Sequence, residues 1–434
     1  MSDTGIPGHW RWRRDPMRDD VVRCFAAGIA AADPAQATRK ALARADVKPR
    51  FTRLVAVGKA ALPMAHAADT LLRTGSSAWD RAVVVPPAGA PIIPAWLPVV
   101  PGEHPLPGPA SVTAADAVGR AVEGLSAADT VLLLLSGGAT SLMAAPVPGV
   151  SPHSLGRIFA DVLASGLDIH EANIIRKRFL RWGGGRLAAV LGNAACLTLA
   201  ISDVIGDQPA SIGSGPVTAD PATAADVARL SAHSGIRLPD DARHLLDDVT
   251  AHPERETPKP DDSCFRNVQH HIIASNRDAV AGAAHAAAGA GWAITSSPEP
   301  LQGDAAAAGG EIARRLLTMR DGRRHALILG GETTVTIRSG AGLGGRSHEL
   351  ALAAARELEG MDRVLLLAAG TDGRDGTTGS AGAIVDGASW QVMSGAADAL
   401  ARHDSGTVLG RAGLALHTGL TGTNVMDVVI GLCW

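Results

Sequence analysis

The stretch TVLLLLSGGATS, residues 130–141, decides the fold class of this chain. A run typical of a buried strand leads directly into small residues, and a short helical pattern follows. In open α/β sheets, ligands bind at the carboxyl ends of such strands, and N–H groups at a following helix N-terminus favour anions. The loop is therefore a candidate phosphate cradle, although a tight turn without a ligand fits it equally well. Its candidate residues are Ser136, Gly137, Gly138, Thr140 and Ser141.

The same strand–loop–helix pattern recurs on both sides of this stretch. Arg53–Val57 is a short strand-like run that stops at Gly58-Lys59 before an alanine-rich helix, and Cys196–Ile201 stops at Ser202-Asp203. Ala82–Val85 is a further strand candidate. Repeated units of this kind predict an α/β fold, with a Rossmann-like parallel sheet covered by helices on both faces.

A change in composition divides the chain. From about Ala225 to Asp262 the sequence is more polar, lacks strand signals and ends in a proline-rich segment. The α/β pattern then resumes, and Ala326–Leu329 with Thr333–Arg338 resembles a strand pair. A chain of 434 residues is too long for one hydrophobic core. We therefore expect two α/β domains, residues 1–260 and 261–434.

The bulk composition excludes several classes of protein. A net charge of -3 does not indicate nucleic acid or an anionic membrane as partner. The four cysteines are widely spaced without a C-x-x-C pair, which argues against a zinc site or a disulfide framework. No apolar segment has the length of a signal-peptide core or a membrane span. The expected location is the cytoplasm.

Single residues in these loops could carry chemistry or could be structural. Lys59 offers a mobile positive charge after a strand, but Arg53 stands where a Walker A loop requires glycine. Asp372 in TDGRDG and Asp203 could hold Mg²⁺ or accept a proton from a hydroxyl, and each could equally belong to an ordinary turn. His104 could contact a substrate or could be an ordinary loop histidine.

A glycine-rich loop in the second half allows a different reading. Gly340, Gly342 and Gly345 match G-x-G-x-x-G between an expected strand and an expected helix. Asp362 follows at about the spacing of a dinucleotide-binding acid. A single fingerprint is weak, and Arg346 beside the last glycine suits a polyphosphate equally well. A purely structural turn is also open.

Taken together, the motifs resemble those of the ATP-dependent glycerate 2-kinases whose C-terminal half is called the MOFRL domain. The matching stretches occur in the family's order from about residue 20 to 432. They are VGKA (57–60), GEHP (102–105), LSGGATS (135–141), ISDVIGD (201–207), GSGP (213–216), GGETTV (330–335), GGR (344–346), AGTDG (369–373) and TGTNVMD (421–427).

The resemblance implies a Rossmann-like first domain, a MOFRL-type α/β second domain and an active site in the cleft between them. It implies transfer of the γ-phosphoryl group of ATP to the 2-hydroxyl of D-glycerate, giving 2-phosphoglycerate. Lys59 and Arg346 match basic residues that hold phosphate or substrate, and Asp372 matches an acid near the hydroxyl or the metal. Such roles suit phosphoryl transfer, which depends mostly on positioning and charge neutralisation.

Further substrate- or phosphate-binding residues come from the same resemblance. They are His104, Arg176, Asp203, Ser214, Glu332 and Asn424, beside the loop residues of the cradle. ATP and Mg²⁺ are the implied cofactors, with Asp203 and Asp372 as the implied metal ligands. The implied partners are a small hydroxy acid and a nucleotide, with no nucleic acid and no membrane; whether the chain forms a homodimer is left open.

Three departures from the family's pattern fall in loops that we expect to line the cleft. Trp182 stands where a second lysine is expected, Ser347-His348 replaces an Asn–Gln pair, and Gly379 replaces an acidic residue. Exchange of a cation for an indole at Trp182 is expected to weaken or reshape an anion site. The phosphate-binding residues are thus predicted to be kept and the surroundings of the acceptor to be altered.

Two other functions remain open beside the kinase. An NAD(P)-dependent hydroxypyruvate reductase, a label also used in this family, would use the Gly340–Gly345 loop. A family member that binds a nucleotide or a sugar acid without turnover would explain the departures from the family's pattern.

Overall fold

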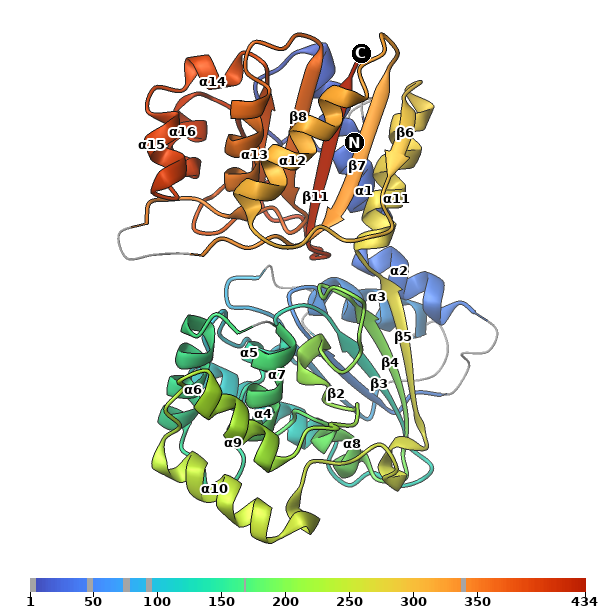
Figure 1. Cartoon of the computed structure of the whole chain (residues 1–434). Helices are drawn as coiled ribbons and strands as arrows, with labels where there is room; N and C mark the ends of the chain where they lie inside the picture. The colour runs from blue at the N-terminus through green and yellow to red at the C-terminus, as the bar shows by residue number, and fades with distance from the viewer. Residues whose placement is uncertain (1–4, 45–49, 73–78, 91–95, 168, 337–340) are drawn as a thin grey trace. The chain divides into compact units, whose positions relative to one another are not determined.

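The fold is seen in a computed structural model, which describes residues 5–44, 50–72, 79–90, 96–167, 169–336 and 341–434. The chain divides into two compact units. Unit 1 comprises Met1–Asp33 and Ala274–Trp434, and unit 2 comprises Pro34–Ile273. Each unit is built around one β-sheet with helices packed on it (Figure 1). The predicted α/β fold class is confirmed.

Unit 2 contains a five-stranded sheet in the order β2-β1-β3-β4-β5. Its strands are β1 (Arg53–Val57), β2 (Arg81–Val85), β3 (Thr130–Leu135), β4 (Ala195–Ile201) and β5 (Val268–Ala274). The pairs β1–β2, β1–β3 and β3–β4 are parallel. The order of the strands reverses between β1 and β3, and such a topological switch point is where open α/β sheets bind ligands.

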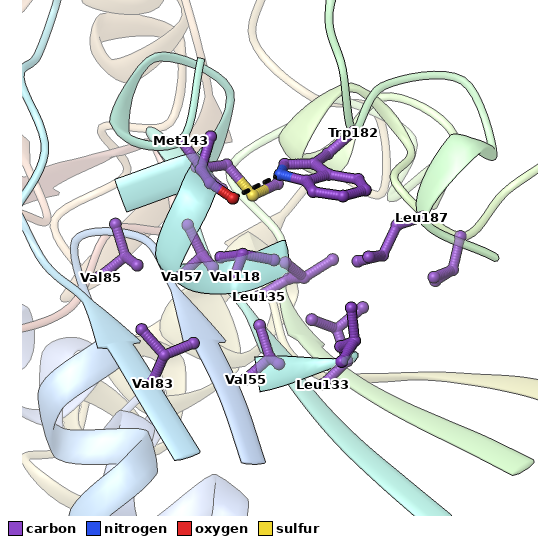
Figure 2. Packing of buried hydrophobic residues seen from close by; sticks show 14 of the residues in the cluster. Val55, Val57, Val83, Val85, Val118, Leu133, Leu135, Met143, Trp182 and Leu187 are labelled. Atoms are coloured by element: carbon purple, nitrogen blue, oxygen red, sulfur yellow. Dashed lines mark hydrogen bonds between the residues drawn. The ribbon is translucent and has the colours of Figure 1, made fainter. Parts of the chain in front are cut away.

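Helices cover this sheet and form an additional core beside it. They are α2 (Pro34–Leu42), α3 (Ala61–Leu72), α4 (Pro109–Ala121), α5 (Ala139–Leu142), α6 (Pro152–Ala164), α7 (Ile169–Phe179), α8 (Arg186–Leu191), α9 (Ala224–His233) and α10 (Asp240–Ala251), with 3-10 turns at Ile212–Ser214, Pro253–Arg255 and Ser263–Phe265. Residues of α4, α5 and α8 share one apolar cluster with alternate residues of the strands (Figure 2). Helices α6, α7, α9 and α10 enclose a separate cluster.

Unit 1 contains a six-stranded mixed sheet in the order β10-β9-β8-β11-β7-β6. Its strands are β6 (Ala293–Ser296), β7 (His325–Gly331), β8 (Val364–Gly370), β9 (Gly382–Asp386), β10 (Ala415–Leu416) and β11 (Asp427–Cys433). β6 and β7 are parallel, whereas β11 runs antiparallel to both of its neighbours, β7 and β8. The last strand of the chain therefore lies inside the sheet, where its apolar run is fully buried.

The helices of unit 1 lie on both faces of this sheet. They are α1 (Pro16–Ala31), α11 (Asn276–Gly289), α12 (Ala305–Thr318), α13 (Arg346–Glu357), α14 (Ser389–Val392), α15 (Ala396–Ala401) and α16 (Ser405–Arg411). α12 and α13 pack together on one face, and α1 and α11 pair on the other (Figure 1). The buried Arg18 of α1 donates to the carbonyl of Ile384 and to Asp386, which fastens the N-terminal helix to β9.

Several details differ from the sequence expectations. In the described part of Thr333–Arg338 only Thr334 forms a β-bridge, with Asp304, and residues 337 and 338 lie outside the described residues. The polar stretch after Ala225 folds into α9 and α10, each with one buried apolar face. The division at residue 260 stays a prediction, and the compact units differ from it because α1 packs with the second half. Across the described ranges, no helix is both long and apolar enough to cross a membrane.

Candidate functional site

The cradle predicted at residues 136–141 lies at the switch point of the unit 2 sheet. β1 and β3 are parallel neighbours, and the register that pairs Val57 with Leu135 brings their carboxyl ends side by side. Gly58-Lys59 follows β1 directly, and Ser136-Gly137-Gly138 follows β3. The two loops that the sequence singled out separately therefore form one feature.

Hydrogen bonds donated by main-chain N–H groups join these two loops. The Lys59 N–H donates to the carbonyl of Gly137 at 2.9 Å, and the Ala60 N–H donates to the Ser136 hydroxyl at 3.0 Å. Gly58 has φ +132°, and a Cβ atom there would collide with the Ser136 side chain and lie 2.5 Å from its carbonyl oxygen. Gly58 is therefore required for the close approach that sets the root of the Lys59 side chain beside the cradle.

Two further predicted residues border the cradle. A Cβ atom on Gly138 would lie 3.3 Å from His104 Nε2 and 3.5 Å from Lys59 Cγ, so both side chains lie over this glycine. The Ser141 hydroxyl donates to the carbonyl of Pro105 at 2.7 Å and holds the loop of His104. Lys59, His104 and the small residues thus enclose one site in unit 2.

The opposite side of the cradle is closed by the GSGP turn. The hydroxyls of Thr140 and the buried Ser214 lie 2.9 Å apart. The carbonyl of Ser214 accepts a hydrogen bond from the N–H of Gly184, in the loop that follows α7. Asp203 is half-buried directly after β4, the neighbour of β3 in the sheet. The structure therefore gathers most of the residues predicted for unit 2.

Arg176 is placed differently, on helix α7. Its guanidinium lies 5.4 Å from the ring centroid of Phe159, a residue of the apolar cluster that α6, α7, α9 and α10 enclose. Burial lowers the pKa of Arg176 from its ordinary value, although a guanidinium stays charged at any ordinary pH. Its link to the cradle passes through α7 and Gly184 rather than through a direct contact.

In unit 1 the sheet register brings three acidic residues together. Asp427 is the first residue of β11 and pairs with Gly331 at the end of β7 and with Gly370 at the end of β8. Glu332 follows Gly331, and Asp372 lies two residues after Gly370. A Cβ atom on Gly370 would lie 3.4 Å from Asp427 Oδ1 and 3.5 Å from Asp372 Oδ1, so these two carboxylates are neighbours.

Arg346 binds two of these carboxylates. It is the first residue of α13, and its Nε and Nη2 donate to Asp427 at 2.5 and 3.1 Å, while Nη1 donates to Glu332. Burial opposes its charge, but the carboxylates of Asp427 and Glu332 outweigh that effect and raise the pKa of Arg346. Burial raises the pKa of Asp427, and Arg346 acts against this rise. We conclude that the guanidinium is permanently charged and a third of its side chain remains exposed.

A buried carboxylate holds the start of α13 in place. Asp375 accepts hydrogen bonds from the N–H groups of Ser347 and His348 at 3.1 and 2.7 Å, as an N-cap residue would. The His348 ring bonds Asp375 through Nδ1 and the Ser380 hydroxyl through Nε2. His348 and Asp375 therefore tie the helix of Arg346 to the loop of Asp372. The capping role of Asp375 could not be predicted from the sequence, because Ser347, which it caps, lies 28 residues away along the chain.

The dinucleotide fingerprint is not supported at its acidic position. Asp362 comes after the C-terminus of α13 and pairs with Arg320 at 2.6 Å, with most of its side chain exposed. A helix of this length separates it by about 18 Å from the glycines at the helix N-terminus. Gly340 lies outside the described residues, and Gly342 and Gly345 pack against Asp404 and Asp375.

Trp182 does not line a binding site, and the expectation that it reshapes an anion site is wrong. Its side chain is 8% exposed and belongs to the apolar cluster with Met143 and Leu187, as Figure 2 shows. The indole N–H donates to the carbonyl of Ala115 in α4 at 2.9 Å. A large aromatic residue whose N–H is hydrogen-bonded is stable in an apolar core, whereas a lysine at this position would bury its charge without a partner.

The structure also shows where the other two departures from the family's pattern lie, at Ser347-His348 and at Gly379. His348 is fully buried and acts through Asp375 and Ser380, so it does not offer its ring to a ligand. Gly379 is exposed with open space around it. In the part of the chain that the structure describes, no cluster of three or more acidic, histidine or cysteine side chains could hold a metal ion.

Comparisons with known proteins agree with the motifs. The chain matches the domain of unknown function DUF4147 over residues 20–247 and the MOFRL family over residues 325–427. A D-glycerate 2-kinase of Thermotoga maritima is 36% identical over 391 residues, which cover 87% of this chain and 90% of that protein. A putative hydroxypyruvate reductase of Agrobacterium vitis is 34% identical over 432 residues, which cover 96% and 94%.

A solved structure is also similar to this chain. The crystal structure of a glycerate kinase from Thermotoga maritima matches with a TM-score of 0.84 and 34% identity, covering 96% of this chain and 99% of that one.

Proposed function

The chain belongs to the glycerate 2-kinase family, and on this premise we propose that it transfers the γ-phosphoryl group of ATP to the 2-hydroxyl of D-glycerate. The products are 2-phosphoglycerate and ADP. The observation that carries the proposal is the joined pair of loops at the switch point of unit 2, which sets Lys59 beside a cradle of small residues. This is the kind of site that an α/β sheet offers to phosphate.

The chemistry asked of the protein is mainly charge neutralisation and positioning. Charge spreads over the equatorial oxygens of the transferring phosphoryl group, and fixed cations stabilise it. Lys59 supplies a mobile ammonium at the cradle. Arg346 supplies a fixed guanidinium, because Asp427 and Glu332 hold it from two sides while part of it stays exposed. We assign both residues to the phosphate groups of the nucleotide or to the substrate.

Asp372 is the residue that we assign to the acceptor hydroxyl or to the metal. It is half-buried at the end of β8, and its Oδ1 accepts one hydrogen bond from the N–H of Arg374 at 3.0 Å. Mg²⁺ is usually bound by one or two carboxylates together with substrate phosphates. Asp203 in unit 2 and Asp372 in unit 1 are each proposed as a carboxylate of this kind. Mg²⁺ would neutralise phosphate charge, and Asp372 would orient the hydroxyl.

The acceptor preference is expected to follow the family. The exchange at Trp182 lies in the core, and that at His348 is satisfied within unit 1, so neither gives a reason to alter the acceptor. His104, Ser214, Glu332 and Asn424 stay proposed binding residues. We also propose a cytoplasmic location and small-molecule partners only.

The hydroxypyruvate reductase is a weaker alternative. The name of the Agrobacterium vitis relative favours it, whereas the exposed pairing of Asp362 with Arg320 removes the acid that its nicotinamide cofactor would need. A member of the family without catalytic activity would bind ATP and release no ADP.

An acceptor screen separates these functions. Purified protein is incubated with ATP, Mg²⁺ and a panel of D-glycerate, other short hydroxy acids and sugar acids, and ADP release and product mass are measured. We expect ADP and a phosphorylated glycerate. The proposal fails if no acceptor yields ADP while hydroxypyruvate oxidises reduced nicotinamide, followed by its absorbance.

A further inference from the structure

The residue before Asp427 has an unusual backbone conformation. Met426 has φ +65° and is only 4% exposed. Positive φ is uncommon for residues other than glycine and is strained for a bulky side chain. Such strain persists only where the surrounding structure fixes the backbone. The next residue, Asp427, binds Arg346, so the contacts that fix Met426 also determine where this carboxylate lies.

The hydroxyl of Thr371 fixes the carbonyl of Met426. Thr371 follows β8 directly and is 1% exposed. Its Oγ1 donates to the carbonyl of Met426 at 2.6 Å and accepts a hydrogen bond from the N–H of Val425 at 2.9 Å. Its own N–H donates to the carbonyl of Met426 at 3.0 Å. The hydroxyl acts both as donor and as acceptor, which serine could reproduce and valine could not.

The side chain of Asn276 fixes the carbonyls on either side of Met426. Asn276 is the first residue of α11 and is 8% exposed. Its Nδ2 donates to the carbonyls of Val425 and Asp427 at 2.7 and 2.9 Å. Three successive carbonyls, at residues 425–427, therefore accept hydrogen bonds from two buried side chains. We call the side chains of Thr371 and Asn276 the Met426 clamp.

The same loop is bound to the backbone of Asp372. The Thr421 hydroxyl donates to the carbonyl of Thr371 at 2.5 Å, and the Thr421 N–H donates to the carbonyl of Asp372 at 3.3 Å. The Oδ1 atoms of Asp372 and Asp427 both lie within 3.5 Å of the position that a Cβ atom on Gly370 would take. The hydrogen bonds between the two loops therefore set the spacing of these carboxylates.

We propose that Thr371 and Asn276 are positioning residues for the phosphoryl transfer. They hold the carboxylates of Asp372 and Asp427 at a fixed separation, and Asp427 in turn orients Arg346. This role rests on the proposed function, in which Asp372 serves the hydroxyl or the metal. Both clamp residues are buried, so they act through these groups and do not bind a ligand themselves. Misplacement of reacting groups by about 1 Å can cost about 100-fold in rate.

Replacement of Thr371 by valine removes the hydroxyl at nearly constant volume. We expect kcat to fall by about 100-fold, while the KM values for ATP and D-glycerate stay within about twofold of the wild type. The segment 421–427 should take up deuterium faster, because the N–H of Val425 loses its acceptor. Steady-state ADP release and hydrogen–deuterium exchange measure the two effects.

A conservative variant and a matched control separate positioning from stability. Thr371→Ser keeps the hydroxyl but loses a buried methyl group, so its Tm should fall by about 2–4 °C, as in Thr371→Val, while kcat stays within about threefold of the wild type. Thr38 of α2 is fully buried, and its hydroxyl donates to the carbonyl of Pro34 at 2.8 Å. Thr38→Val should lower the Tm by a similar amount and leave kcat unchanged.

The outcomes separate the clamp from the proposed function. The clamp has no positioning role if Thr371→Val keeps kcat within about threefold of the wild type, or if Thr371→Ser loses as much kcat as Thr371→Val. Should Thr371→Val not fold, Asn276→Leu takes its place, with an expected loss in kcat of about tenfold. Wild-type protein that releases no ADP with any acceptor would disprove the kinase. The clamp is then judged by exchange alone, and equal deuterium uptake at 421–427 in Thr371→Val and the wild type would overturn it.

Discussion

The cradle of unit 2 and the cluster of Arg346 with Asp427 and Glu332 in unit 1 hold their residues by different means. In the cradle, hydrogen bonds donated by main-chain N–H groups and a glycine with positive φ join the loops after β1 and β3. In the cluster, the sheet register places the carboxylates beside the Arg346 guanidinium. Ion pairs between these side chains then hold the guanidinium in place. The first arrangement depends on backbone shape and the second on charge. Substitutions should therefore affect the two regions in different ways.

The largest effect is expected when the cation of either region is removed. Lys59→Ala and Arg346→Ala should each lower kcat by about 10³-fold, because each loses fixed stabilisation of transition-state charge. Steady-state ADP release measures this loss. Lys40→Ala and Arg356→Ala, on exposed parts of α2 and α13, are the matched controls.

The double variant sharpens the comparison between the two regions. If Lys59 and Arg346 stabilise the same phosphoryl group, the double variant should lose much less than the product of the single losses. Near-normal turnover of either single variant would contradict the proposed roles.

The dependence of the cradle on backbone shape is tested at Gly58. Gly58→Ala should cost about 3 kcal/mol of stability, because the new Cβ meets the main chain of Ser136 and the φ of +132° is strained for alanine. Chemical denaturation measures the loss. Gly124→Ala is the control, since Gly124 also has positive φ but open space, and it should cost only about 1 kcal/mol. Equal costs would show that the contact with Ser136 does not matter.

The dependence of the cluster on charge is tested at Asp427. Asp427→Asn keeps the shape but breaks a largely buried ion pair with Arg346, and we expect a loss of about 2 kcal/mol in thermal unfolding. Turnover should fall as well, because Arg346 loses its fixed orientation. Asp362→Asn, in an exposed pair with Arg320, should change stability by less than about 0.5 kcal/mol. A neutral Asp427→Asn would mean that shape alone holds Arg346.

The smallest effect is expected at Trp182, which lies outside both regions. Trp182→Phe should cost about 1.5 kcal/mol, since it loses the hydrogen bond to Ala115 and leaves part of the space of the indole empty in the apolar cluster. The KM for D-glycerate should stay within about twofold of the wild type. A clear change in acceptor preference would return Trp182 to the binding site.

The parallel half of the fold was predictable because its signals are local. β1 and β3 are apolar runs that end in small residues, and each is followed by a helical pattern, so strand, loop and helix can be read within a dozen residues. The position of both loops at a switch point depends on strand order, which no short stretch of sequence reveals. The join between Lys59 and Gly137 was therefore beyond prediction.

The mixed sheet of unit 1 was harder to predict. β11 is a clear apolar run, but its place between β7 and β8 follows from pairings more than 50 residues apart in the chain. Without knowledge of that register, the sequence shows Asp427 only as the last residue of the motif TGTNVMD and does not reveal its contact with Arg346. Trp182 was misassigned because the family has a lysine at this position, and a lysine in a loop indicates a ligand site. The burial of the Trp182 side chain, which decides what it contacts, could not be read from the sequence.

The segmented composition of unit 1 has a consequence for how the protein is made. All of unit 2 is synthesised before Ala274 is added, so it can fold once it has emerged from the ribosome, while the rest of the chain is still being made. Helix α1 must wait for α11, and the sheet of unit 1 lacks its central strand until Asp427–Cys433 has emerged. A chain that lacks Asp427–Cys433 would therefore carry a folded cradle beside an incomplete unit 1 sheet, with unpaired strand edges exposed to aggregation and to proteases.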